Sequence, residues 1–95
     1  MTAKVSVSRA PLTPERLFAY AIGYTKSAYA ADLASMHPTF RQAARHFKVS
    51  LDAIEQACED WHGSGYMRAA VGFRAGGGGI GEYKSRGDWL VEAYE

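Results

Sequence analysis

The chain has 95 residues, of which 47% are hydrophobic and 22% charged, a composition that predicts one small globular domain and excludes disordered or collagen-like chains. Its formal net charge is only +1, so the overall charge indicates no particular partner. The single cysteine excludes an internal disulfide, and no apolar run approaches the roughly 20 residues of a membrane span or resembles a secretory signal, so we expect a cytoplasmic protein without membrane contact.

The first expected elements are a short strand and a helical region. Alternating β-branched residues predict a strand over residues 4–8. Thr13, Pro14 and Glu15 then form a helix start, with an N-cap, a proline whose missing N–H costs nothing, and an acid in the first turn. Gly23 weakens this helix and leaves two alternatives open, one bent helix over residues 14–36 or two shorter ones.

Two further helices are expected with a very short connection between them. Thr39 is a suitable N-cap for a helix over residues 40–47. The connection ends at Ser50, which caps a second helix over residues 51–61 with a continuous apolar stripe. Helices of these lengths, joined by three residues, predict a helix-turn-helix unit over residues 39–61.

The pattern then changes to strands. Residues 66–74 contain no acid and alternate as a strand does, and a second strand is predicted over residues 80–84, beyond the glycine run 76–79. These two strands would form a hairpin with a glycine tip. Turn-forming residues follow at 85–88, and residues 89–94 are either a third strand or a closing helix.

The segment from Thr39 to Ala57 resembles the helix-turn-helix of bacterial and phage transcription regulators. The resemblance rests on a small residue where the helices cross, an apolar plug in the turn, and an apolar anchor in the second helix: Ala43 or Ala44, Val49 and Ile54. With the hairpin over residues 66–84, the whole is similar to a winged helix-turn-helix domain. The resemblance implies an α+β fold for residues 1–95, with a three-helix core and a C-terminal β-hairpin wing.

The resemblance also implies sequence-specific binding of double-stranded DNA by a transcriptional regulator. Base edges would be read from the exposed start of the second helix, by Ser50, Asp52, Ala53 and Gln56, of which Gln56 suits adenine. Phosphates would be met by Thr39, Arg41, Arg45 and Lys48, and the wing would contribute Arg68, Arg74, Lys84 and Arg86. Because one such module contacts few base pairs, a homodimer is expected.

The distribution of charge supports an alternative from another class. Residues 1–51 carry seven bases and two acids, whereas residues 52–95 carry four bases and eight acids. The expected recognition helix has no base and carries Asp52, Glu55, Glu59 and Asp60, which phosphates repel. The alternative is a protein-interaction module, in which this acidic helix and the tyrosines of the first helix, Tyr20, Tyr24 and Tyr29, form the contact surfaces on a winged-helix scaffold.

Patterns for catalysis or cofactor binding are weak. The spacing of His37, His46 and His62 matches no common metal site, and Cys58 is expected inside the core. The glycine run satisfies the dinucleotide-binding pattern only by repetition, with no helix predicted to open after it. We therefore expect no enzymatic activity, no cofactor and no bound metal.

Overall fold

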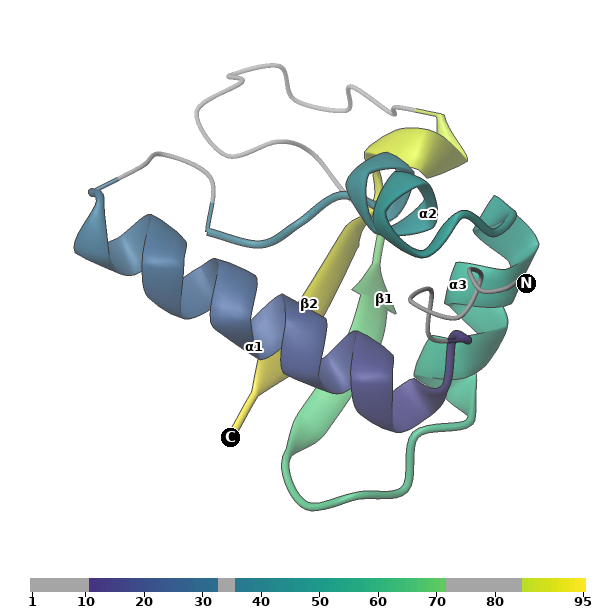
Figure 1. The fold of residues 1–95 in the computed structure, drawn as a ribbon, viewed down its shortest axis with the longest axis horizontal. Coiled ribbons are helices and arrows are strands. Elements are labelled where there is room, and N and C mark those ends of the chain that lie inside the picture. Colours follow the sequence, from purple (N-terminus) through teal and green to yellow (C-terminus); the bar gives the residue numbers. More distant parts are fainter. Residues whose placement is uncertain (1–10, 33–35, 72–84) are drawn as a thin grey trace, which may run out of the picture.

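Three helices and an antiparallel pair of strands make up the described part of the chain, residues 11–32, 36–71 and 85–95 of a computed structural model (Figure 1). The elements in chain order are α1 (Pro14–Ala30), α2 (Phe40–Phe47), α3 (Leu51–Glu59), β1 (Tyr66–Ala70), the short 3₁₀ helix η2 (Arg86–Asp88) and β2 (Leu90–Tyr94). The predicted strands over residues 4–8 and 80–84, and the glycine run, lie outside the described residues. The α+β composition of the domain is thus confirmed.

A single continuous helix, α1, occupies the first helical region. Its N-terminus has the expected cap, because the Thr13 hydroxyl accepts a 3.1 Å hydrogen bond from the Arg16 backbone N–H. The helix ends at Ala30, and Asp32 has a left-handed backbone with φ of 58°. The prediction of helix as far as residue 36 was therefore wrong, because a residue with that φ cannot continue a right-handed helix.

Replacing Gly23 by alanine is expected to stabilise the protein. Gly23 lies inside α1, and a Cβ built there meets nothing within 4 Å. Because glycine in a helix costs about 0.5–1 kcal/mol relative to alanine, Gly23→Ala should raise the free energy of unfolding in urea by this amount. Gly63→Ala is the contrasting variant, since its Cβ would overlap the Trp61 indole and should destabilise. A destabilising Gly23→Ala would contradict a helix at this position.

The helices α2 and α3 are joined by a tight turn, as predicted. Thr39 caps α2 in a capping box with Gln42, each residue's side chain accepting a hydrogen bond from the other's backbone N–H. Lys48 turns the chain with a left-handed backbone, φ 58° and ψ 51°, and Ser50 caps α3 by accepting from the Ala53 N–H at 3.1 Å. The helix α3 ends at Glu59, two residues before the predicted end.

The strand β1 pairs with the C-terminal strand. The strands are antiparallel, and their register runs from Tyr66 opposite Tyr94 to Ala70 opposite Leu90. Of the two alternatives for residues 89–94, a strand or a closing helix, the structure has the strand, over residues 90–94. The predicted hairpin partner of residues 66–74, the strand over residues 80–84, lies outside the described residues, and the described partner of β1 is β2. Burial favours the observed pairing, because the inward residues of β2, Val91 and Ala93, are almost completely buried.

A short stretch before α2 extends this sheet on the other side of β2. The Phe40 N–H donates to the Trp89 carbonyl, and the Val91 N–H donates to the Pro38 carbonyl, both at 2.8 Å. Thr39 and Leu90 form the corresponding antiparallel bridge. The strand β2 is therefore held between β1 and residues 38–40, which ties the start of α2 to the hairpin.

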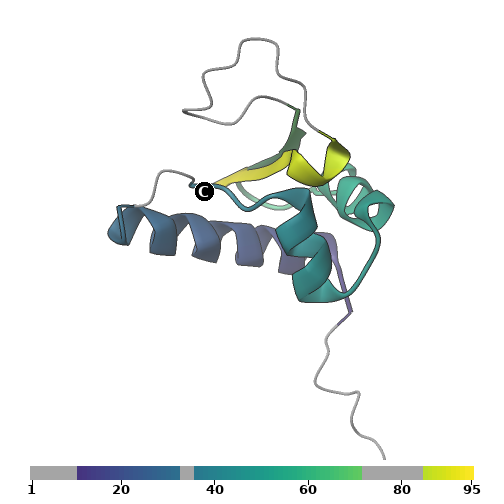
Figure 2. The same cartoon turned by 90° about the horizontal axis from the view of Figure 1, so that it is seen from above.

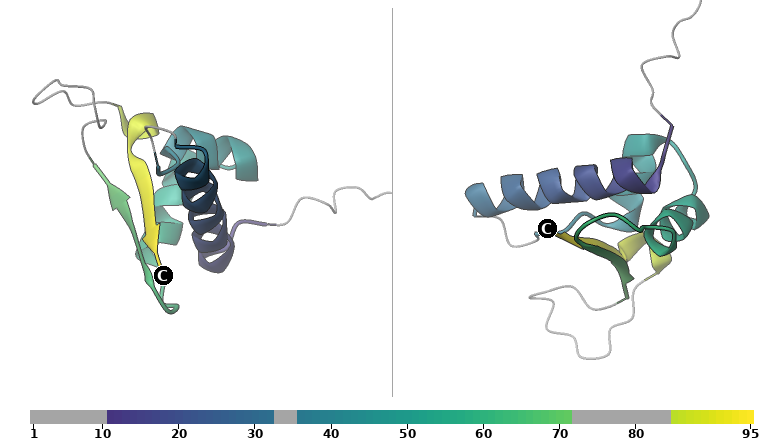
Figure 3. Two further views of the ribbon diagram at one scale, coloured as in Figure 1. Left: turned by 90° about the vertical axis from the view of Figure 1, so that its left-hand side faces the viewer. Right: turned by 90° about the horizontal axis from the view of Figure 1, so that it is seen from below.

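The core lies between the helices and the inner face of the hairpin, and Figures 2 and 3 show the helices gathered on that face. It combines large residues with alanines that let the elements approach closely. The buried members are Leu17, Ala21, Phe40, Ala43, Ile54, Ala57, Cys58, Met67, Val91 and Ala93. The predicted crossing residue Ala43 and anchor Ile54 are fully buried, and the predicted plug Val49 packs against the core.

The thiol of Cys58 is expected to react slowly in the folded protein. Burial, assisted by the charges of Glu55 and Glu59, raises its pKa from 9.0 to about 12, so little reactive thiolate exists at pH 8. Because the folded state holds this proton more tightly than the unfolded state, the contribution to stability is complete below pH 9 and is lost as the pH rises above it. Iodoacetamide labelling should accelerate strongly in urea, and equal rates with and without urea would contradict the burial.

Candidate nucleic-acid interface

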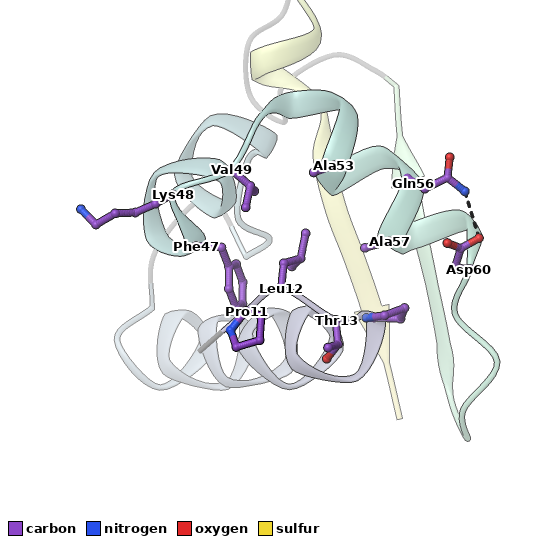
Figure 4. A pocket seen from close by; sticks show the side chains of 11 residues that line it. Pro11, Leu12, Thr13, Phe47, Lys48, Val49, Ala53, Gln56, Ala57 and Asp60 are labelled. Atoms are coloured by element: carbon purple, nitrogen blue, oxygen red, sulfur yellow. Dashed lines mark hydrogen bonds between the residues drawn. The ribbon is translucent and has the colours of Figure 1, made fainter. Parts of the chain in front are cut away.

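The cations at the end of α2 and in the turn lie on the surface. Arg45 belongs to the last turn of α2, and Lys48 follows it in the turn that leads into α3. Both residues are exposed, and neither side chain has a charged or hydrogen-bonded partner among the described residues. Figure 4 shows the Lys48 side chain extending away from the helices into solvent. These two predicted phosphate contacts are therefore accessible.

The structure gives Arg41 and Thr39 other contacts. Arg41 donates from Nη1 to Asp88 at 2.8 Å and from Nη2 to Ser85 at 3.5 Å. Its guanidinium covers Gly87, where an added Cβ would lie 2.5 Å from Nη2. Arg41 thus holds η2 against α2, and the Thr39 hydroxyl is occupied by its cap.

At the exposed start of α3, Arg86 of η2 lies between two carboxylates. Nη1 of Arg86 lies 2.6 Å from the Asp52 carboxylate and donates a 3.0 Å hydrogen bond to Glu55. The Asp52 carboxylate first, and then that of Glu55, raises the pKa of Arg86. Arg86, a residue of η2, is thereby held against two residues of α3 that precede it by more than 30 positions in the sequence.

The other predicted base-reading residues lie between the N-cap and the middle of α3, with Gln56 one helical turn beyond Asp52 on nearly the same face. The Ser50 hydroxyl is used by the cap, and Gln56 donates from Nε2 to Asp60 at 3.0 Å (Figure 4). Ala53 and Gln56 line a groove of about 880 Å³ that the sequence did not predict. Its remaining lining comes from the N-terminus of α1, the turn and α3: Pro11, Leu12, Thr13, Pro14, Phe47, Lys48, Val49, Ala57 and Asp60.

The wing residues divide into described and undescribed ones. Arg68 lies on the outer face of the hairpin, where it pairs with Glu92 at 3.0 Å and covers the Tyr66 ring at 5.5 Å. The hydrogen bond to Glu92 raises the pKa of Arg68. Arg74 and Lys84 lie outside the described residues.

The surface charge changes sign along α3. At its N-terminal end, Arg45, Lys48 and Arg86 provide three bases against the two acids Asp52 and Glu55. At its C-terminal end, Glu59 and Asp60 are exposed. With a rise of 1.5 Å per residue, Glu59 lies about 6 Å along the axis from Glu55, which is within the Debye length of about 8 Å at physiological salt. The two ends therefore differ in net charge but remain electrostatically coupled.

The tyrosines of α1 do not form one exposed surface. Tyr20 stacks on His46 with ring centroids 4.4 Å apart and meets the edge of Phe47 at 5.6 Å. Burial raises the pKa of Tyr20, and the nearby Tyr24 adds to the shift. Tyr29 alone among the three is largely exposed, at 73%. The stacked Tyr20 and His46 instead fix α1 against α2.

Comparison of the chain with protein-family models, with curated proteins and with solved structures found no match. Within residues 11–32, 36–71 and 85–95, no three His, Cys, Asp or Glu side chains are grouped as metal ligands. In the same residues, no helix has the length and apolar character needed to cross a bilayer.

Proposed function

We propose that this protein binds double-stranded DNA as a winged helix-turn-helix regulator, with α3 as the recognition helix. The order of elements supports the proposal: α1, the short stretch 38–40 beside β2, then α2 and α3 with a tight turn, and finally the β1–β2 hairpin. A helix with the diameter of α3, about 10–12 Å with side chains, fits the major groove of B-DNA. A homodimer forms part of the proposal, because one module this small contacts few base pairs.

The observation that carries the proposal is the pair of unpartnered cations beside the N-terminus of α3. Arg45 and Lys48 are exposed and make no ion pair within the described residues. The N-terminus of a helix also carries a partial positive charge from its aligned peptide dipoles. Both features attract phosphates to the end of α3 that a helix-turn-helix places against the duplex.

The acids at the start of α3 are compatible with this placement. Asp52 and Glu55 share the guanidinium of Arg86, which neutralises one of the two charges. Asp52 also lies in the first turn, where the helix dipole stabilises a carboxylate. The two other acids, Glu59 and Asp60, lie at the far end of α3. The helix therefore approaches DNA with its N-terminal end.

A salt titration tests the proposal. Fluorescence anisotropy with a labelled random-sequence duplex should give a binding constant whose logarithm falls linearly with the logarithm of the salt concentration. Selection of bound duplexes from a random pool should then enrich a shared sequence. Absence of duplex binding at low salt would overturn the proposal, because the electrostatic attraction is strongest there.

The exposed acids favour a second candidate function, a protein-interaction module. Glu59 and Asp60 form an acidic end on α3 that would suit a basic protein surface. The same titration separates the two candidates. A protein module should fail to bind a duplex, and its partner should be released when Glu59 and Asp60 are replaced by their amides.

A further inference from the structure

We propose that Arg86 reads a guanine base and that Asp52 and Glu55 hold its guanidinium in the reading position. This inference rests on the proposed DNA binding and assigns a base preference to the same surface. It also gives the acids of the recognition helix a role in recognition.

Both carboxylates face the same nitrogen of Arg86. Nη1 lies 2.6 Å from an oxygen of Asp52 and 3.0 Å from an oxygen of Glu55. Among the described residues, Nε and Nη2 have no partner, and the Arg86 side chain remains 37% exposed. The N–H groups of Nε and Nη2 point in one direction along the other edge of the planar group, which leaves a fork of two parallel donors.

A fork of two parallel donors matches guanine. In the major groove, guanine presents the two acceptors O6 and N7, and bidentate contact from an arginine is the commonest specific contact with DNA bases. A phosphate could accept the same fork. The position favours a base, because Arg86 sits against Asp52 in the first turn of α3, the part of a recognition helix that meets base edges.

The carboxylates fix a side chain that would otherwise be mobile. A free arginine loses considerable rotamer freedom when it binds, and this entropic cost weakens its contact with a base. Asp52 and Glu55 are three residues apart on one face of α3, so they hold Nη1 from two sides. The 3₁₀ helix η2 fixes the Arg86 backbone, since Arg41 binds Asp88 in the same turn. The guanidinium is therefore ordered before DNA arrives.

The test compares base preferences of the wild-type protein and two variants. Duplexes selected from a random pool by the wild type should contain a guanine whose replacement weakens binding roughly 5- to 150-fold. Arg86→Lys keeps the charge but has no second edge of donors, so it should lose this preference while its affinity for random duplexes changes little. Arg16→Lys is the matched control, because it alters an exposed arginine of α1 to which no DNA contact is assigned, and it should retain the preference.

The second variant removes both carboxylate charges, Asp52→Asn with Glu55→Gln. Two lost negative charges should tighten binding to every duplex, while the guanine preference falls because Arg86 is no longer held. Tighter binding with an unchanged preference would overturn the inference, since the acids would then only repel phosphates. Circular dichroism of each variant confirms the fold before binding is measured.

The remaining outcomes separate this inference from the proposed function. If the wild type binds duplexes with a steep salt dependence but prefers no guanine, or if Arg86→Lys retains the preference, the reading role is overturned and DNA binding stands. If the wild type binds no duplex at low salt, both are overturned.

Discussion

The double variant Arg45→Gln and Lys48→Gln should bind every duplex more weakly and with a flatter salt dependence. Counterions are released where a cation of the protein contacts a phosphate, so each lost contact lowers the number released on binding. Two lost contacts should make the slope of log K against log salt concentration less steep by about 2. Both side chains are exposed, and among the described residues neither makes an ion pair, so their removal should leave the fold unchanged. Fluorescence anisotropy at several salt concentrations gives the slope directly.

Lys26→Gln is the control for this prediction. Lys26 is an exposed lysine near the C-terminal end of α1, where it pairs with Glu95 at 3.4 Å. This part of α1 extends away from α3 (Figure 1), so the salt slope should not change. An equal effect of Lys26→Gln and the double variant would mean that the protein attracts DNA through its overall charge, without a defined interface.

Phe40→Ala should cost about 3–5 kcal/mol of folding free energy, which is the usual range for truncating a buried phenylalanine. Phe40 is fully buried, and its ring meets Trp89 with centroids 5.6 Å apart. Its backbone N–H also joins α2 to the residue before β2. Because the total free energy of unfolding of a small domain is only about 5–15 kcal/mol, the variant should be close to unfolding at room temperature. Urea denaturation followed by circular dichroism measures the loss.

Tyr29→Ala provides the comparison for this core variant. The Tyr29 side chain is 73% exposed, so its removal should change the free energy of unfolding by no more than about 0.5 kcal/mol. A loss below about 1 kcal/mol for Phe40→Ala would show that α2 is not packed against β2 as described.

Local signals were sufficient to predict the helices and the turn between two of them. Thr13, Thr39 and Ser50 all cap helices as predicted, because a cap depends on a side chain and a backbone N–H three residues away. The same locality explains the correct helix-turn-helix spacing. The prediction failed at the end of α1, where the left-handed Asp32 stops a segment rich in alanine.

The candidate site was predictable only in part. The exposed cations Arg45 and Lys48 follow from the amphipathic pattern of α2 and the shortness of the turn. The ion pair between Arg41 and Asp88 could not be predicted from local patterns, because these residues are 47 positions apart in the sequence. The groove beside α3 was missed for the same reason, since its lining comes from three separate parts of the chain.

The sequence by itself determined the helices, their caps and the acidic character of α3. Only the tertiary structure decided that β1 pairs with residues 90–94 and that Arg86 lies between Asp52 and Glu55. Helix capping and periodicity act within a few residues, so they can be read along the chain. Strand partners and ion pairs between distant residues depend on how the whole core packs, and no local pattern specifies that packing.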